Sequence, residues 1–416
     1  MDKVNSVLII GANFTNKGAE AMLKTVQAQL RKKNREVICY MICRKYEREL
    51  AESFGFIPIY RNDTPLKIWI DSYVYRIKGK LYKLFTGVVR PWYFPFPFGE
   101  INKIVKKLDA IIDVSGFAYA DSWGKPMVDE TIKLIKLSRP YHVKFFFMPQ
   151  AWGPFENPEV AKSAQHMLSL ADGFFARDMV SQTHLAGVVG KDIKDIPLLP
   201  DLVFSAGEQG DIPSTNRLKD ERLGGSTIRV GISPNLRVYE KMGNKGADNV
   251  YIKVLLSLCN YCLQTFKAEI VFIPNELFPD SVVHPDDRGL CRQLYEALGK
   301  PASCKVIDRY ASSEDIREQV RQVDLLVSSR FHALIFGFLA RKPVMAISWS
   351  HKYRELFGLF GLEDFVLESN LIDEQSVIAK FQQLVGESEE ISSKIDEKLP
   401  FLKQQIDTMF DNLFSC

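Results

Sequence analysis

An arginine and a histidine lie two positions apart in the segment Ser328-Ser-Arg-Phe-His-Ala333. An apolar run precedes this segment and an apolar helical pattern follows it, so the pair falls where a buried strand gives way to a helix. Free backbone N–H groups and the positive end of a helix dipole favour anions at such a junction. Arg330 supplies a fork of donors for phosphate or carboxylate, and His332 can exchange a proton near neutral pH. The other interpretation is a salt-bridged arginine beside a core histidine; the arginine at a strand end favours the anion site.

Other polar side chains also follow predicted strands. These candidate ligand-binding residues are Asn13, Lys17, Asp113, Gln150, Trp152, Arg177, Asn235 and Lys352. Because ligands collect at the carboxyl ends of parallel strands, we expect Arg177, Arg330, Lys352 and His332 to face one small anionic molecule.

The remaining candidates suit a polar ligand. Gln150 and Trp152 place a hydrogen-bonding amide next to an aromatic face, a combination that commonly holds sugars. Asp113 either orients sugar hydroxyls and accepts a proton, or caps the next helix, and both interpretations stay open. Asn13 and Lys17 belong to a glycine loop that matches neither a dinucleotide fingerprint nor a Walker loop.

The elements that must position these residues follow an alternating pattern. Apolar strand-like runs are separated by helical patterns over residues 7–10, 35–43, 110–114, 143–148 and 173–176, and again over 228–233, 269–273, 304–307, 324–328 and 344–348. Such alternation predicts parallel sheets covered by helices on both faces. The predicted fold class is α/β, with two doubly wound Rossmann-like domains facing across a cleft.

The chain of 416 residues is too long for one comfortable core. We expect an N-terminal domain over 1–205, a linker rich in glycine, proline and charge over 206–227, and a C-terminal domain over 228–385. Residues 386–416 form a predicted helix that packs back on the N-terminal domain.

One segment departs from the alternation. Residues 61–98 carry many lysines and arginines interleaved with aromatic side chains. This composition fits a helix lying on an anionic membrane surface, near a lipid-linked substrate, and it fits equally a solvated helix whose aromatic face completes the core.

Bulk composition excludes several classes of protein. Hydrophobic residues make up 46% of the chain and charged residues 25%, which argues against extensive disorder. A formal net charge of +3 does not favour nucleic acid as a partner.

No run approaches the ~18 apolar residues that span a bilayer. We therefore expect a cytoplasmic protein, and peripheral contact with the inner face of the membrane stays open as a second possibility. No spacing of residues suits a metal, and the pair Cys259 and Cys262 falls inside a helical pattern that predicts core packing.

Taken together, several motifs resemble the polysaccharide pyruvyl transferases. They are Gly11-Ala-Asn-Phe-Thr-Asn-Lys-Gly-Ala-Glu-Ala21, Pro149-Gln-Ala-Trp-Gly-Pro-Phe155, Ala176-Arg-Asp-Met-Val-Ser181, Pro200-Asp201 and Ser328-Ser-Arg-Phe-His-Ala333 with Pro343 and Lys352. The resemblance implies a GT-B-like fold and a transferase of exopolysaccharide biosynthesis. Its donor substrate would be phosphoenolpyruvate, with no separate cofactor, and its acceptor a sugar or lipid-linked glycan. The N-terminal domain would bind the acceptor and the C-terminal domain the donor anion.

The resemblance also implies roles for residues. Arg177 and Arg330 would hold the phosphate and carboxylate of phosphoenolpyruvate, and His332 would protonate its methylene carbon. Asp113 would act as base toward the acceptor, although Ser115-Gly-Phe117 replaces the run of glycines that many relatives have there. Two alternatives stay open: a GT-B glycosyltransferase that uses a nucleotide sugar, and a non-catalytic subunit of a glycan-assembly complex.

Overall fold

The computed structural model describes residues 4–60, 96–207, 227–244 and 246–414. The chain divides into two compact units. The first unit comprises Met1–Asn13, Val26–Leu202 and Thr408–Cys416, and the second comprises Phe14–Thr25 and Val203–Asp407. The predicted boundaries did not anticipate that residues 14–25 would group with the second unit.

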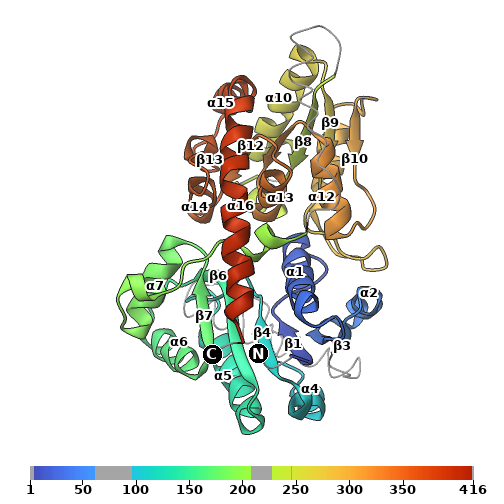
Figure 1. The fold of residues 1–416 in the computed structure, drawn as a ribbon. Helices are drawn as coiled ribbons and strands as arrows, with labels where there is room; N and C mark the ends of the chain where they lie inside the picture. Colours follow the sequence, from blue (N-terminus) through green and yellow to red (C-terminus); the bar gives the residue numbers. More distant parts are fainter. Residues whose placement is uncertain (1–3, 61–95, 208–226, 245, 415–416) are drawn as a thin grey trace. The chain divides into compact units, whose positions relative to one another are not determined.

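The first unit contains a parallel sheet with the strand order β3-β2-β1-β4-β6-β5, and β7 also pairs with β6 (Figure 1). The strands are β1 (Ser6–Ile10), β2 (Ile38–Ile42), β3 (Ile57–Ile59), β4 (Ala110–Asp113), β5 (Phe117–Tyr119), β6 (Lys144–Trp152) and β7 (Gly173–Ala176). All residues of β1 and β4 are buried. A strand covered on both faces needs apolar residues without alternation, which is the pattern these segments have.

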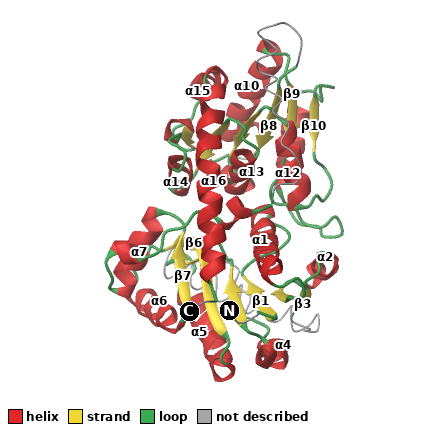
Figure 2. Ribbon diagram, in the orientation of Figure 1, coloured by secondary structure: helices red, strands yellow, loops and turns green. Residues whose placement is uncertain are grey.

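Helices connect and cover these strands (Figure 2). They are α1 (Lys17–Lys33), α2 (Arg48–Ser53), α4 (Phe98–Ile104), α5 (Lys125–Ser138), α6 (Pro158–Leu170) and α7 (Met179–Val189). The side chains of Asn157 and Asp178 accept backbone N–H groups at the starts of α6 and α7, so both helices begin at capping residues.

The second unit repeats this design with the strand order β10-β9-β8-β11-β12-β13, again all parallel. The strands are β8 (Arg229–Ser233), β9 (Glu269–Phe272), β10 (Cys304–Val306), β11 (Leu325–Ser328), β12 (Val344–Ser348) and β13 (Val366–Glu368). Its helices are α9 (Leu236–Lys241), α10 (Val250–Thr265), α11 (Asp287–Ala297), α12 (Ser313–Gln322), α13 (Phe331–Leu339), α14 (Lys352–Gly358), α15 (Glu374–Gly386) and α16 (Ser388–Asn412) as far as Asp407. The end of α16, from Thr408, belongs to the first unit. The predicted α/β class with two doubly wound sheets is confirmed.

In each sheet the strand order reverses next to the first strand. In the first unit the chain builds β1, β2 and β3 toward one edge and returns to place β4 on the other side of β1. In the second unit β8 and β11 are the corresponding neighbours. Such a reversal separates the loops of adjacent strands and leaves a crevice at their carboxyl ends. The loops after β1, β4, β8 and β11 therefore lie where a ligand is expected.

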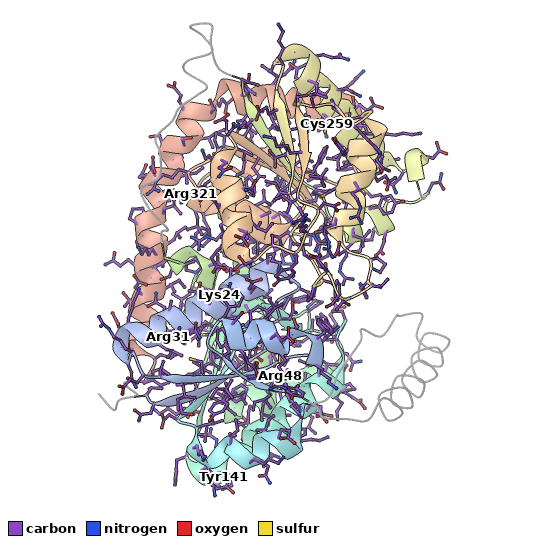
Figure 3. The ribbon with its side chains drawn as sticks, turned by 90° about the vertical axis from the view of Figure 1, so that its right-hand side faces the viewer. Lys24, Arg31, Arg48, Tyr141, Cys259 and Arg321 are labelled. Carbon is purple, nitrogen blue, oxygen red and sulfur yellow. The ribbon has the colours of Figure 1, made fainter. Side chains whose placement is uncertain are left out.

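The core prediction for the two cysteines of the Cys-x-x-Cys sequence is confirmed. Cys259 and Cys262 lie on α10 and are fully buried, and Figure 3 labels Cys259 within this unit. Burial raises the pKa of the Cys262 thiol to about 12, so the group stays protonated and packs as a small apolar side chain.

A buried ion-pair network holds residues 14–25 in the second unit. The ammonium of Lys17 is fully buried, 2.9 Å from the Glu20 carboxylate and 3.9 Å from the centre of the Tyr310 ring. Glu20 also accepts the backbone N–H of Ser313 at 2.9 Å. Lys24, labelled in Figure 3, pairs with both Glu20 and Glu314. One carboxylate thus links the first turns of α1 to the start of α12.

Two predicted segments fall outside the description. Residues 61–95 of the basic aromatic segment and 208–226 of the linker are not among the described residues, so their interpretations stay predictions. None of the helices in the described part of the chain has the length and apolar character that crossing a bilayer requires.

The network makes Glu20 a sensitive position. Glu20→Gln keeps the shape of the side chain but leaves the buried ammonium of Lys17 without its counter-charge, which costs about 3–5 kcal/mol when a buried pair loses one partner. We expect the free energy of unfolding, measured by urea denaturation, to fall by this amount. The exposed Glu36 offers a control, since Glu36→Gln should change stability by less than about 0.5 kcal/mol. Equal effects of the two variants would contradict the stabilising role of the pair.

Candidate functional site

Arg330 and His332 lie at the predicted strand-to-helix junction. β11 ends at Ser328, and α13 begins at Phe331 with Arg330 as its N-cap residue. The side chain of Arg330 makes no capping hydrogen bond. The hydroxyl of Ser328 accepts the backbone N–H of Arg330 at 2.9 Å and fixes this turn. The start of α13 therefore presents backbone donors at the crevice beside β8.

Two carboxylates hold the guanidinium of Arg330. Its Nη1 atom lies 2.9 Å from Glu276 and its Nη2 atom pairs with Asp287. Burial acts to lower the pKa of Arg330, but these carboxylates raise it overall, so the group stays charged. Burial raises the pKa of Asp287, although Arg330 acts in the opposite direction. The buried Nε atom of Arg330 makes no hydrogen bond within the described residues.

His332 packs against the first turn of α1. A Cβ atom placed on Gly18 would lie 1.9 Å from Cγ and 2.0 Å from Nδ1 of the imidazole. Only glycine at this position leaves room for the ring. Its neighbour Phe331 contacts the imidazole edge-to-face, with ring centres 5.4 Å apart. His332 as a whole is half-buried, and its Nε2 atom is buried.

Lys352 joins this site as the first residue of α14, which follows β12. Its ammonium lies 5.2 Å from the centre of the Phe331 ring and 4.7 Å from that of Trp349. Lys241 at the end of α9 lies 4.4 Å from the Trp349 ring as well. Cation–π attraction can hold both ammonium groups near one indole. A positive cluster of Lys241, Trp349 and Lys352 thus adjoins the start of α13.

Asn235 serves the scaffold rather than a ligand. Its amide nitrogen donates to the Ser329 carbonyl at 2.9 Å, and its amide oxygen accepts the N–H of Arg237 at the start of α9. Tyr251 and Tyr353 also donate to Ser329, at 2.7 Å each. Because both amide atoms of Asn235 are engaged, its predicted role in substrate binding is corrected: it fixes the loop that carries Arg330.

In the first unit, Arg177 and Gln150 lie side by side at the ends of β7 and β6. The backbone N–H of Arg177 donates to the Gln150 carbonyl at 3.1 Å, and its guanidinium lies 2.8 Å from Asp201. Gln150 is 1% exposed, and neither atom of its amide makes a hydrogen bond within the described residues. An unsatisfied buried amide is costly, so this position requires an explanation beyond packing.

Trp152 does not lie where the sequence predicted. The indole is 1% exposed, and its N–H donates to the Phe175 carbonyl at 2.9 Å. One face stacks on Tyr119 at 5.3 Å and the ring also meets Phe147 edge-to-face. A ring enclosed in this way cannot offer its face to a sugar, so the prediction is corrected: Trp152 is a core residue.

Asp113 ends β4 and is fully buried. Its carboxylate accepts the hydroxyl of Tyr119 at 2.5 Å and the backbone N–H of Ser115 at 2.8 Å. Burial raises the pKa of this carboxyl above its usual value, although both hydrogen bonds act to lower it. The arrangement supports a loop-fixing role, and the role of base toward an acceptor stays a prediction.

The two candidate residues of the glycine loop, Asn13 and Lys17, differ in their burial. Asn13 is half-buried just after β1. The predicted substrate-binding role of Lys17 is corrected. Its ammonium contacts Glu20, the Phe14 carbonyl at 2.6 Å and the Tyr310 ring. A lysine without access to solvent or to the crevice holds the loop and does not meet a substrate.

Sequence reasoning missed the residues that orient the candidates. Asp287 and Glu276 direct Arg330, Gly18 admits His332, and Trp349 holds Lys352. Only Trp349 had a local signal, because it follows a predicted strand. Among the residues described, no group of three or more His, Cys, Asp or Glu side chains is arranged to bind a metal ion.

Comparison with known proteins identifies one family. The polysaccharide pyruvyl transferase family matches residues 16–351. A curated relative is the amylovoran biosynthesis protein AmsJ of Erwinia amylovora, which is 19% identical over 297 residues, covering 70% of this chain and 69% of that protein.

Solved structures with the same fold include three that contain uridine nucleotides. MnaA of S. aureus with UDP has a TM-score of 0.58 and 10% identity, over 99% of this chain and 97% of that one. UDP-GlcNAc 2-epimerase of Neisseria meningitidis with UDP-GlcNAc has a TM-score of 0.57 and 12% identity, over 99% of this chain and 100% of that one. HepE of Anabaena with UDP-glucose has a TM-score of 0.56 and 13% identity, over 99% of both chains. At these identities the likeness shows the two-domain α/β fold.

The contact between Gly18 and His332 can be tested directly. Gly18→Ala adds a methyl group where the imidazole lies, so we expect displaced ring signals of His332 in NMR spectra and a loss of about 1–3 kcal/mol in stability from overpacking. Gly289→Ala is the matched control, because Gly289 lies on α11 with open space around it. That control should be neutral or stabilising by up to about 1 kcal/mol. An unchanged His332 signal in Gly18→Ala would refute the contact.

Proposed function

Because the chain belongs to the polysaccharide pyruvyl transferase family, we propose that it moves the enolpyruvyl group of phosphoenolpyruvate onto a hexose of a bacterial surface polysaccharide or its lipid-linked precursor. The observation that carries this proposal is the junction at the end of β11, where Arg330, His332 and the start of α13 meet Lys352. It provides an acid–base group next to positive charge.

The reaction balances with protein side chains alone. His332 donates a proton to the methylene carbon of phosphoenolpyruvate, which leaves an oxocarbenium-like centre at the neighbouring carbon. One sugar hydroxyl bonds to that carbon, and its proton passes to the imidazole of His332, which restores the acid. A second hydroxyl then bonds to the same carbon as the carbon–oxygen bond to phosphate breaks, and its proton leaves with the phosphate. The products are a cyclic ketal and inorganic phosphate.

Charge in the second unit decides how the donor would bind. Arg330 with Asp287 and Glu276 carries no net positive charge when the three groups are ionised, so this trio alone attracts no trianion. Lys352, Lys241 and the backbone N–H groups at the start of α13 supply the positive potential. The carboxylates instead fix the guanidinium so that its Nε–H remains for the ligand.

Acceptor binding is assigned to the first unit. The unsatisfied amide of Gln150 can donate to one sugar hydroxyl and accept from another. Arg177, which the family resemblance gives to phosphoenolpyruvate and not to the acceptor, lies beside Gln150 and is paired with Asp201. These residues support a polar ligand at the carboxyl edge of the sheet. Cytoplasmic location and peripheral contact with the membrane belong to the same proposal, because phosphoenolpyruvate and lipid-linked precursors meet there.

The reaction can be measured as release of inorganic phosphate from phosphoenolpyruvate in the presence of sugar acceptors, with the ketal identified by mass spectrometry of the glycan. We expect His332→Ala to lower kcat by about 10²–10⁴-fold, the usual worth of a general acid. His284→Ala, an exposed histidine of the same unit, should leave the rate unchanged.

Two other outcomes would overturn the proposal. Turnover with a nucleotide sugar and none with phosphoenolpyruvate would favour a glycosyltransferase, the enzymatic alternative that the sequence leaves open. A His332→Ala variant that folds and retains the cellular role would instead favour a non-catalytic assembly subunit.

The charge argument gives a separate prediction. Lys352→Met removes one positive charge next to α13, so we expect the KM for phosphoenolpyruvate to rise about tenfold or more, as the loss of a hydrogen bond to a charged group implies. Lys380→Met is the matched control, since Lys380 also lies over an aromatic ring, 5.6 Å from the centre of Phe365. Equal KM values for the two variants would remove Lys352 from the donor site.

A further inference from the structure

A groove of about 680 Å³ opens on the first unit just beyond the end of β6. Its polar lining comes from the loop after β6 and from helices α6 and α7: Glu156, Lys162, Gln165, Thr183 and His184, with Phe155 as an apolar surface. The volume falls within the ~300–1,000 Å³ that small-molecule sites usually have. Of these residues, only Phe155 belongs to a motif named in the sequence analysis.

The groove contains a histidine whose tautomer is fixed. The Nδ1 atom of His184 lies 2.8 Å from the Trp152 carbonyl. A carbonyl can only accept, so Nδ1 carries the hydrogen, and the neutral ring keeps an acceptor at Nε2. A Cβ atom on Gly153 would lie 2.4 Å from Nδ1, so the absence of a side chain there lets the imidazole reach the backbone. The ring is oriented before any ligand arrives.

The loop that forms one wall is also fixed. Asp121 accepts the backbone N–H groups of Glu156 at 2.7 Å and of Asn157 at 3.2 Å. The backbone N–H of Asp121 donates in return to the Pro154 carbonyl at 3.0 Å. Asn157 then caps α6. A wall held in place in this way costs little to order when a ligand binds.

The chemistry of the lining selects a class of ligand. Glu156 and Lys162 carry opposite charges, so the groove has no net charge to attract an anion. Lys162 donates, Glu156 and His184 accept, and Gln165 does both. The hydroxyl of Thr183 donates to the Met179 carbonyl at 3.0 Å, so it can accept from a ligand. Sugar hydroxyls also donate and accept, and the apolar side chain of Phe155 suits the carbon face of a pyranose ring. A neutral, hydroxyl-rich ligand matches this set.

We infer that the groove is a second glycan subsite, which binds neutral sugar residues of the acceptor chain away from the residue that is modified. This inference rests on the proposed function for the acceptor, and it extends the acceptor-binding surface from Gln150 along the end of β6. The connection is short, because the carbonyl that orients His184 belongs to Trp152, two residues after Gln150. The subsite would favour chains of several sugars over single sugars.

Binding can be measured without turnover. The probes are neutral glucose and galactose oligosaccharides of one to four residues, titrated by calorimetry and by NMR of the histidine rings. We expect affinity to increase with chain length and the His184 signals to shift. His184→Asn keeps a donor for the Trp152 carbonyl but loses the acceptor at Nε2, so binding of the longest probe should weaken about tenfold. Glu156→Gln provides a second, exposed variant with the same expected direction.

The matched control is His166→Asn, because His166 is an exposed histidine of α6 outside the groove lining, and its variant should bind like the unmodified protein. Affinity independent of chain length, an unchanged His184→Asn variant, or a response of His184 to inorganic phosphate instead of sugars would each overturn the inference. Failure of the proposed function appears separately, as oligosaccharide binding with no phosphate release from phosphoenolpyruvate.

Discussion

The buried ammonium of Lys17 is the constraint on which the arrangement around Arg330 and His332 depends. A charge without solvent must be neutralised and hydrogen-bonded, and Glu20, the Phe14 carbonyl and the Tyr310 ring meet this requirement. The requirement fixes the first turn of α1. The backbone of Lys17 bonds to Asn275, next to Glu276, and Gly18 lies against His332. The first turn of α1 therefore lies next to both Glu276, which pairs with Arg330, and the imidazole of His332.

This arrangement changes the meaning of the conspicuous arginine. A buried guanidinium with two carboxylates is an oriented group rather than a free positive charge. Its long side chain is held by these carboxylates, so little further rotational freedom would be lost when a ligand binds. The positive potential must come from elsewhere, and the lysines around Trp349 and the uncapped start of α13 supply it. Arg330 is thus the oriented group, and Lys241 and Lys352 supply the positive charge.

A glycine next to an imidazole recurs in the two units. Gly18 admits the ring of His332, and Gly153 admits the ring of His184. In both places the missing side chain lets a ring approach a backbone segment closely, which limits the ring to few rotamers. A histidine used for proton transfer or for ligand recognition gains from such limits because its nitrogen atoms keep fixed directions.

The sequence by itself determined the fold class, most strands and the strand-to-helix junction of Arg330 and His332. The spacing of apolar residues, the helix-capping residues and the position of a residue at the end of a strand are all local properties of the chain. The three-residue strands β3, β5 and β13 were not predicted, whereas β10, which has the same length, was predicted as residues 304–307. Tertiary structure alone decided that Lys17 and Trp152 are buried, that both amide atoms of Asn235 are engaged, and that Asp287 and Glu276 hold Arg330. These outcomes depend on partners far away in the chain, and residue type does not reveal which long-range partner a polar side chain will meet.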